Sequence, residues 1–127
     1  MTYRFNKHYS REEANALLPQ IRQWLVQLRQ LRQELEKLET RLGGMTAPGN
    51  DVGGDLVNRR VKTMADIKEV LDEFQTREIF IKDPSRELID FPAIVGGKEV
   101  FLCWEQDEEA VEFWHDVESG FAGRERL

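Results

Sequence analysis

The chain of 127 residues has the usual length of one domain, so we expect a single domain over residues 1–127. Its composition, 40% hydrophobic and 33% charged, is typical of a globular protein, and its apolar runs fall well short of the ~20 residues of a membrane-spanning helix. The net charge of −6 argues against a nucleic-acid-binding protein, because contacts of basic side chains with phosphates supply much of that affinity.

A first, long helix is predicted from residue 10 onward. Ser10 and Glu13 have the spacing of a capping box, in which each side chain accepts a hydrogen bond from the other residue's backbone N–H. Pro19 removes one backbone hydrogen bond, but the apolar stripe keeps its phase there, which favours a kink over a break. The stripe alternates steps of three and four residues, as in a coiled coil: Ala14, Leu17, Ile21, Trp24, Leu28, Leu31, Leu35, Leu38 and Leu42. The pair Gly43–Gly44 is predicted to end the helix.

A second helix is predicted after a flexible, glycine-rich loop over residues 44–54, with Asp55 as its N-cap. We expect its apolar stripe to face the first helix, in an antiparallel hairpin over residues 10–76. This stripe consists of Val57, Val61, Met64, Ile67, Leu71 and Phe74. A second row is then not needed for the pairing: Leu56, Thr63 and Val70. Because the first helix is the longer one, its residues 10–21 are expected to cover the C-terminal half of the chain.

A three-stranded antiparallel meander is predicted next, from Ile79–Ile81, Leu88–Val95 and Lys98–Trp104. The pair Gly96–Gly97 is typical of a two-residue hairpin turn, which places Val95 opposite Lys98. Counting back along both strands puts Asp90 directly opposite Cys103, on the other face from the core residues. The predicted core face consists of Ile89, Phe91, Ala93, Val100, Leu102 and Trp104.

A C-terminal helix is predicted to close the sheet, so that residues 78–127 form a meander with a closing helix. Asp107, Glu108 and Glu109 would lie at the positive end of its dipole, and Gly120 would end it. Its buried stripe would consist of Ala110, Val111, Trp114 and Val117. The predicted fold class is therefore α+β: a long, coiled-coil-like antiparallel helical hairpin, a small three-stranded antiparallel sheet and a C-terminal helix.

On such a helix, Glu108, Glu112 and His115 would share one face. The spacing of Glu112 and His115 matches half of the ligand set of di-iron carboxylate bundles, but the chain has only one such pair. We therefore favour a solvated acidic face with a histidine beside it and expect no metal, and the alternative is that these three residues are metal ligands.

A second candidate site joins Asp90, Cys103 and His115, which could converge at the end of the hairpin. A thiolate near an imidazole is how cysteine nucleophiles are activated, although a buried structural cysteine is the commoner case. A carboxylate within a strand needs a partner, for which Lys82, Arg124 or a backbone amide is available. Phosphate-binding loops, zinc fingers and Ser/His/Asp triads have no matching pattern in the sequence.

Several short strings occur together in one order along the chain: Glu13–Pro19, Lys82–Asp83, Ile89–Ala93, Leu102–Trp104, Glu108, Trp114–His115 and Gly120–Arg124. Together they resemble a family of small prokaryotic proteins catalogued as a domain of unknown function, DUF2203. Two positions depart from the family pattern, Asp107 and Glu87, where family members tend to have glycine. The resemblance implies no established activity. It implies that the motif residues worth testing are Asp90, Cys103, Trp104, Glu108, His115 and Arg124.

The sequence leaves two classes of function open. We favour a non-catalytic module that binds another protein or a second copy of itself through the hairpin. The alternative is a metal-binding protein or small enzyme that uses the C-terminal Asp/Cys/Glu/His cluster. We expect no cofactor, no nucleic-acid partner and no membrane association. One cysteine cannot form an internal disulfide, and the N-terminus lacks a signal peptide's apolar core, so we expect a cytoplasmic location.

Overall fold

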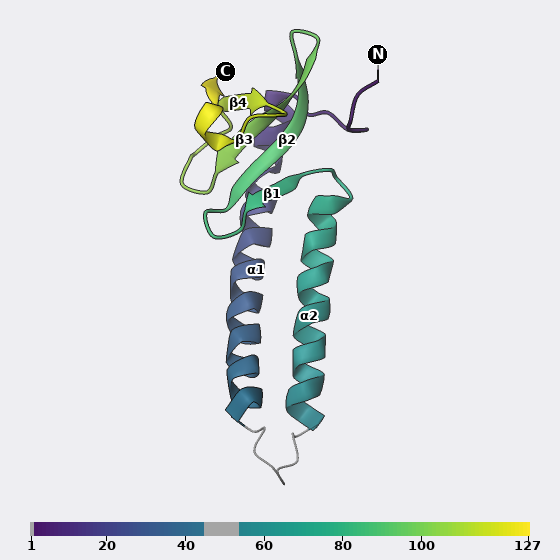
Figure 1. Ribbon diagram of the computed structural model, residues 1–127, viewed down its shortest axis with the longest axis vertical. Helices are drawn as coiled ribbons and strands as arrows, with labels where there is room; N and C mark the ends of the chain where they lie inside the picture. Colours follow the sequence, from purple (N-terminus) through teal and green to yellow (C-terminus); the bar gives the residue numbers. More distant parts are fainter. Residues whose placement is uncertain (1, 45–53) are drawn as a thin grey trace. The chain divides into compact units, whose positions relative to one another are not determined.

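The computed structural model describes residues 2–44 and 54–127 (Figure 1). Within them lie helices α1 (Arg11–Gly44) and α2 (Gly54–Gln75), strands β1 (Phe80–Asp83), β2 (Leu88–Val95), β3 (Lys98–Glu105), β4 (Phe113–Asp116) and β5 (Glu125–Arg126), and a short 3₁₀ helix η1 (Phe121–Gly123). The strands form one antiparallel sheet in the order β1-β2-β3-β4-β5. The α+β class is confirmed, but the three-stranded sheet and the C-terminal helix were wrong. Most of the predicted loop over residues 44–54 lies outside the described residues.

The chain divides into two compact units, Met1–Arg22 with Glu73–Leu127, and Gln23–Asp72. The first unit holds the sheet and the second holds most of the helical hairpin. In the described part of the chain, neither helix combines the length and the apolarity that a membrane crossing requires.

The capping box at the start of α1 is confirmed. The Ser10 N–H donates to Glu13 Oε1 and the Glu13 N–H donates to Ser10 Oγ, each over 3.0 Å. The helix then continues through Pro19 to Gly44, so the expectation that Pro19 does not break the helix is also confirmed.

The first turns of α1 cover one face of the sheet, as predicted from the unequal helix lengths. Arg11 and Arg22 donate hydrogen bonds to the carbonyl oxygens of Val111 and Glu108, over 3.1 and 2.9 Å. Asn15 accepts a hydrogen bond of 2.7 Å from the Val111 N–H. These bonds hold the segment before β4 against the helix.

In the hairpin unit, α1 and α2 run antiparallel (Figure 1). The predicted inner face of α2 was wrong in its first half, because Val57, Val61 and Met64 are 41%, 58% and 45% exposed, whereas Leu56 and Thr63 are buried. Toward the end of the helix it holds, since Ile67 and Leu71 are half-buried and Phe74 is buried. Two arginines on α2 accompany this rotation: Arg59 pairs with Glu34 of α1 and Arg60 with Glu39. These arginines flank the row of Leu56 and Thr63, so both pairs are compatible with that row facing inward, although exposed pairs of this kind contribute little energy. The Thr63 hydroxyl is satisfied by donating to the Arg59 carbonyl oxygen.

The hairpin of β2 and β3 has the predicted register. Gly96 and Gly97 have φ values of +59° and +79°, as a two-residue turn of this kind requires. Val95 lies opposite Lys98, and Asp90 lies opposite Cys103. The predicted core face is buried, and so is the face with Asp90, Phe101 and Cys103.

The N-terminal segment covers part of this second face. The Phe5 ring lies 5.3 Å from the rings of both Phe80 and Phe101. The Glu99 carboxylate accepts hydrogen bonds from the backbone N–H groups of Arg4 and Phe5 and contacts His8 at 2.7 Å. One carboxylate of β3 therefore holds three residues of the segment, and the Tyr9 N–H also donates to the Pro92 carbonyl oxygen of β2 over 2.7 Å.

The predicted C-terminal helix was wrong. The helical spacing of the apolar residues there is outweighed by two local features, one that favours a strand and one that favours a turn. Phe113 and His115 alternate with Trp114 and Asp116 along β4, which is strand periodicity in residues of high strand propensity. The acids before them stabilise a turn instead of a helix start, since the Glu105 N–H donates to Glu108 Oε1 over 2.8 Å. Pairing with β4 also satisfies the edge of β3, which a helix would have left open.

Candidate functional site

Three buried side chains from three neighbouring strands converge on the second face of the sheet: Asp90 of β2, Cys103 of β3 and His115 of β4. Asp90 pairs with Cys103, and His115 pairs with Phe101, which precedes Cys103 by two residues and shares its face. One oxygen of Asp90, the Cys103 sulfur and one ring nitrogen of His115 lie within 4.8 Å of one another. Their residues are 2%, 1% and 3% exposed. Within residues 2–44 and 54–127, this is the only such trio of potential metal ligands.

The hydrogen bonds of His115 define its tautomer. Nδ1 lies 2.8 Å from the carbonyl oxygen of Asp116, which can only accept, so Nδ1 carries a proton. Nε2 lies 3.0 Å from Asp90 Oδ2. Without a metal, this contact needs one further proton, shared between the imidazole and the carboxyl group. His115 is thus the partner of Asp90, in place of Lys82, Arg124 or a backbone amide.

Burial is the largest influence on the pKa values of Asp90 and Cys103. It raises the pKa of Asp90, and the charges of His115 and Lys82 offset this only in part. Burial, with the charge of Asp90 beside it, raises the pKa of Cys103 to about 12 although Arg124 acts in the opposite direction. At neutral pH the sulfur is therefore a thiol, which disfavours the reading of Cys103 as an activated nucleophile.

The trio lines a pocket of about 280 Å³. Lys82, Phe101 and Phe121 contribute to its wall, together with the turn that follows β4. The Phe101 ring lies 5.5 Å from the His115 ring, so the imidazole has an aromatic neighbour on the pocket side. From the sequence, Lys82 was considered only as a partner for Asp90. Nothing in the sequence indicated that Phe101 or Phe121 would line a pocket.

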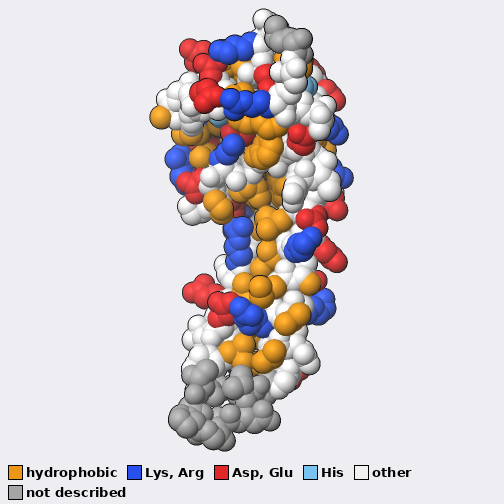
Figure 2. Space-filling model, turned by 45° about the vertical axis from the view of Figure 1, so that its right-hand side comes forward, with side chains coloured by type: hydrophobic (Ala, Val, Ile, Leu, Met, Phe, Trp, Pro, Cys, Tyr) orange, Lys and Arg blue, Asp and Glu red, His pale blue; other side chains and the backbone are white. Residues whose placement is uncertain are grey.

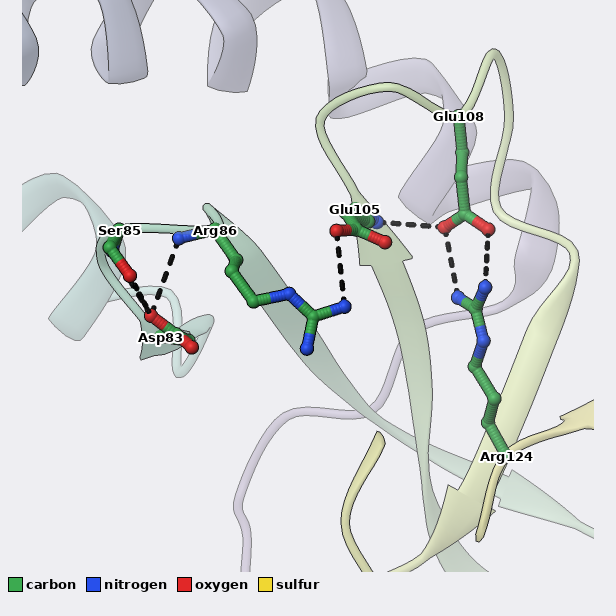
Figure 3. A network of polar contacts seen from close by, with 6 residues as sticks. All are labelled: Asp83, Ser85, Arg86, Glu105, Glu108 and Arg124. Carbon is green, nitrogen blue, oxygen red and sulfur yellow. Dashed lines mark hydrogen bonds and ion pairs between the residues drawn. The ribbon is translucent and has the colours of Figure 1, made fainter. Parts of the chain in front are cut away.

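The remaining motif residues form a second cluster beside the trio. Glu108 and Arg124 make two parallel contacts of 3.1 and 2.9 Å (Figure 3). The Arg124 guanidinium lies 4.0 Å from the ring centroids of both Phe113 and Phe121. Trp104 is on the opposite face of the sheet, and its Nε1–H donates to the Glu108 carbonyl oxygen over 3.0 Å. This cluster fixes the C-terminal segment that brings Phe121 to the pocket.

The predicted face of Glu108, Glu112 and His115 does not exist, because it depended on the C-terminal helix. Glu108 is paired with Arg124, and the Glu112 carboxylate lies 3.8 Å from Arg126. The convergence of Asp90, Cys103 and His115 is confirmed, although His115 reaches it from a strand and not from a helix.

Figure 3 shows one further polar network, on the turn between β1 and β2. Asp83 Oδ1 accepts hydrogen bonds from the backbone N–H groups of Ser85 and Arg86, and the Arg86 side chain pairs with Glu105 over 3.3 Å. This network shapes the end of β1, which carries Lys82.

Comparison with protein families gives one match. The model of a family described as an uncharacterized conserved protein (DUF2203) matches residues 7–127, nearly the whole chain. The chain therefore belongs to this family, as the resemblance of its motifs indicated. Neither the curated proteins nor the solved structures contain a match to the chain.

Proposed function

We propose that this family member binds a divalent transition-metal cation of the Zn²⁺ type through Asp90, Cys103 and His115. The observation that carries the proposal is the convergence of three different buried ligand atoms within 4.8 Å, beside a pocket. Zn²⁺ takes sulfur, imidazole nitrogen and carboxylate oxygen, and three protein ligands leave a fourth position for water or a ligand.

The orientation of His115 supports the proposal. Metal-bound histidines commonly donate the other ring N–H to a carbonyl or carboxylate, which fixes the tautomer and the plane of the ring. The bond from Nδ1 to the Asp116 carbonyl oxygen does this, and it leaves Nε2 facing Asp90. The ligand is thus held in its binding orientation by the backbone of β4.

The distances require a small rearrangement around the ion. Donor atoms about 2.0 to 2.3 Å from a tetrahedral Zn²⁺ lie about 3.5 Å from one another. Asp90 and His115, which are 3.0 Å apart, would separate slightly to admit the ion, and separations within the trio of up to 4.8 Å would shorten by about 1 Å.

The charge of the site would not change on binding. Without metal, Asp90 and His115 share one proton and Cys103 holds another, so the trio is neutral. With Zn²⁺, a carboxylate, a thiolate and a neutral imidazole balance the two positive charges. A dication thus replaces two protons, and the cost of a buried net charge is avoided.

Cobalt absorption spectroscopy tests the proposed bond between the metal ion and the Cys103 sulfur. The chain has a single cysteine, so a thiolate-to-cobalt charge-transfer band can come only from Cys103. We expect stoichiometric Co²⁺ binding with this band in the wild type, and loss of the band in Cys103→Ala. His115→Gln should weaken binding, whereas His8→Gln, which replaces the only other histidine, should not. Wild-type protein that binds no Co²⁺ and no Zn²⁺ contradicts the proposal.

Self-association through the hairpin is a second candidate function. Val57, Val61 and Met64 form an exposed apolar row on α2. Hydrophobic side chains are visible along the hairpin in Figure 2. The row would pack against the same row of a second copy, since identical patches suit a two-fold contact. The row first assigned to this role was Leu56, Thr63 and Val70, of which Leu56 and Thr63 are buried and Val70 is half-buried. The support for self-association is therefore the exposed row of Val57, Val61 and Met64.

Light scattering after gel filtration tests this second candidate. We expect a dimer for the wild type and a monomer for Val61→Glu. Lys62→Glu, next to it and outside the row, is the matched control. A wild-type protein that is monomeric at tens of micromolar contradicts self-association through this row.

A further inference from the structure

We infer that the fourth position of the metal site takes a small carboxylate ligand with a compact apolar group, whose charge Lys82 neutralises. This inference rests on the metal site proposed above, and it names the ligand class that the same pocket selects.

Lys82 lies at the pocket, two residues after Phe80, which pairs with Asp90, and at a β-bulge. Ile81 pairs with Ile89 and Asp83 with Leu88, so Lys82 is an extra residue between two ladder positions. Its side chain lies on the face of Asp90 and lines the same pocket. Nζ is 4.8 Å from the ring centroid of Phe101 and 5.3 Å from that of Phe80, so two aromatic rings hold the ammonium group in place.

Lys82 has no anionic partner among residues 2–44 and 54–127. No carboxylate in this part of the chain lies within 4.0 Å of its Nζ. Glu118, an acid at the pocket, pairs with Arg4, and both Glu118 and Lys82 are exposed residues. Since the trio of Asp90, Cys103 and His115 is neutral with or without a bound dication, Lys82 is the charged group at the pocket that no ion pair in the described part of the chain neutralises. One negative charge on the ligand completes the balance.

The size and lining of the pocket further restrict the class of ligand that can bind. A volume of about 280 Å³ lies just below the roughly 300 to 1,000 Å³ of usual ligand pockets, so only a compact molecule fits. Leu88, Phe101, Val117 and Phe121 supply apolar wall. A carboxylate ligand would place one oxygen at the metal and next to Lys82, and its apolar group would pack against these four side chains. Such a ligand contacts both the charged and the apolar parts of the pocket.

Benzoate and its neutral analogue benzamide are the probes, titrated into the Co²⁺-loaded full-length protein. Benzoate should change the cobalt spectrum saturably, and benzamide should not. Lys82→Met retains an apolar side chain between the two rings but removes the charge. It should weaken benzoate binding by about tenfold or more, measured at saturating Co²⁺ because the charge of Lys82 also acts on Asp90. Lys62→Met, on the hairpin and paired with Asp66, is the matched control and should behave as wild type.

The outcomes separate the two proposals. A cobalt spectrum that benzoate leaves unchanged, or equal benzoate affinity in Lys82→Met and wild type, overturns the ligand inference and leaves the metal site intact. A wild-type protein without any cobalt spectrum overturns the metal site, and the ligand inference falls with it.

Discussion

Two substitutions of Asp90 distinguish a hydrogen-bond role from a metal-ligand role. In Asp90→Asn, the amide N–H can donate to Nε2 of His115, while Nδ1 still donates to the Asp116 carbonyl oxygen. In Asp90→Val, Nε2 loses its partner at a residue that is 3% exposed. Asparagine is nearly isosteric with aspartate, and valine suits a strand, so neither change disturbs β2 for another reason.

The expected changes in the free energy of unfolding follow from the hydrogen bonds that His115 keeps or loses in each variant. Exchanging one satisfied hydrogen bond for another should change the free energy of unfolding by less than about 1 kcal/mol in Asp90→Asn. An unsatisfied buried nitrogen in Asp90→Val should cost about 1 to 3 kcal/mol. For a chain of this length, that corresponds to a melting temperature lower by roughly 4 °C per kcal/mol.

Urea denaturation followed by tryptophan fluorescence measures the stability, and Co²⁺ titration measures the metal affinity. Asp90→Asn should be nearly as stable as the wild type and yet bind Co²⁺ more weakly, because it has lost an anionic ligand. If Asp90→Asn loses as much stability as Asp90→Val, the pair depends on its charges, and a replacement hydrogen bond does not account for its contribution.

Three further predictions address other parts of the molecule. The pKa of Cys103, about 12 against an ordinary 9.0, makes its thiolate about a thousandfold scarcer, so iodoacetamide should label it far more slowly in the native protein than in urea, as measured by mass spectrometry. Burial raises the pKa of Glu99, but hydrogen bonds from His8, Arg4 and Phe5 outweigh it, and the pKa is lowered from 4.5. The stability that Glu99 contributes is therefore present above about pH 4.5 and is lost as the pH falls through the lowered pKa, so thermal melts of wild type and Glu99→Gln should differ at pH 7 and converge in acid. Leu38→Ala should cost about 2 to 5 kcal/mol in urea denaturation, whereas Val61→Ala, on the exposed row, should stay within about 0.5 kcal/mol; equal losses would show that the faces of the hairpin are misassigned.

The parts of the fold that were predicted correctly depend on local signals. The capping box of Ser10 and Glu13 lies within one turn of helix, and the pair Gly96–Gly97 determines the register of both its strands. From that register the sequence could place Asp90 opposite Cys103 without any knowledge of the rest of the sheet.

The parts that were predicted wrongly depend on partners distant in the sequence. The apolar residues of α2 occupy two neighbouring rows, and periodicity does not say which row is buried. Pairing of Arg59 with Glu34, and of Arg60 with Glu39, accompanies burial of the row of Leu56 and Thr63. Residues 113–116 likewise become a strand because the edge of β3 is available to them.

All three members of the candidate site could be predicted, but the position of only two of them. Asp90 and Cys103 followed from the hairpin register, but His115 was expected on a helix, beside Glu108 and Glu112. Its true position follows from the pairing of β4 with β3, which also supplies the carbonyl oxygen that orients the imidazole. Since that orienting group belongs to the backbone, no side chain in the sequence signals it.

The six motif residues separate by position into two roles. Asp90, Cys103 and His115 present ligand atoms to one pocket, whereas Trp104, Glu108 and Arg124 present none. The second group joins the turn after β3 to the C-terminal segment: Trp104 bonds to the backbone of Glu108, the Glu108 carboxylate binds Arg124, and Arg124 packs on Phe121. Phe121 in turn forms part of the pocket wall, so one group supplies the chemistry of the site and the other holds its wall in place.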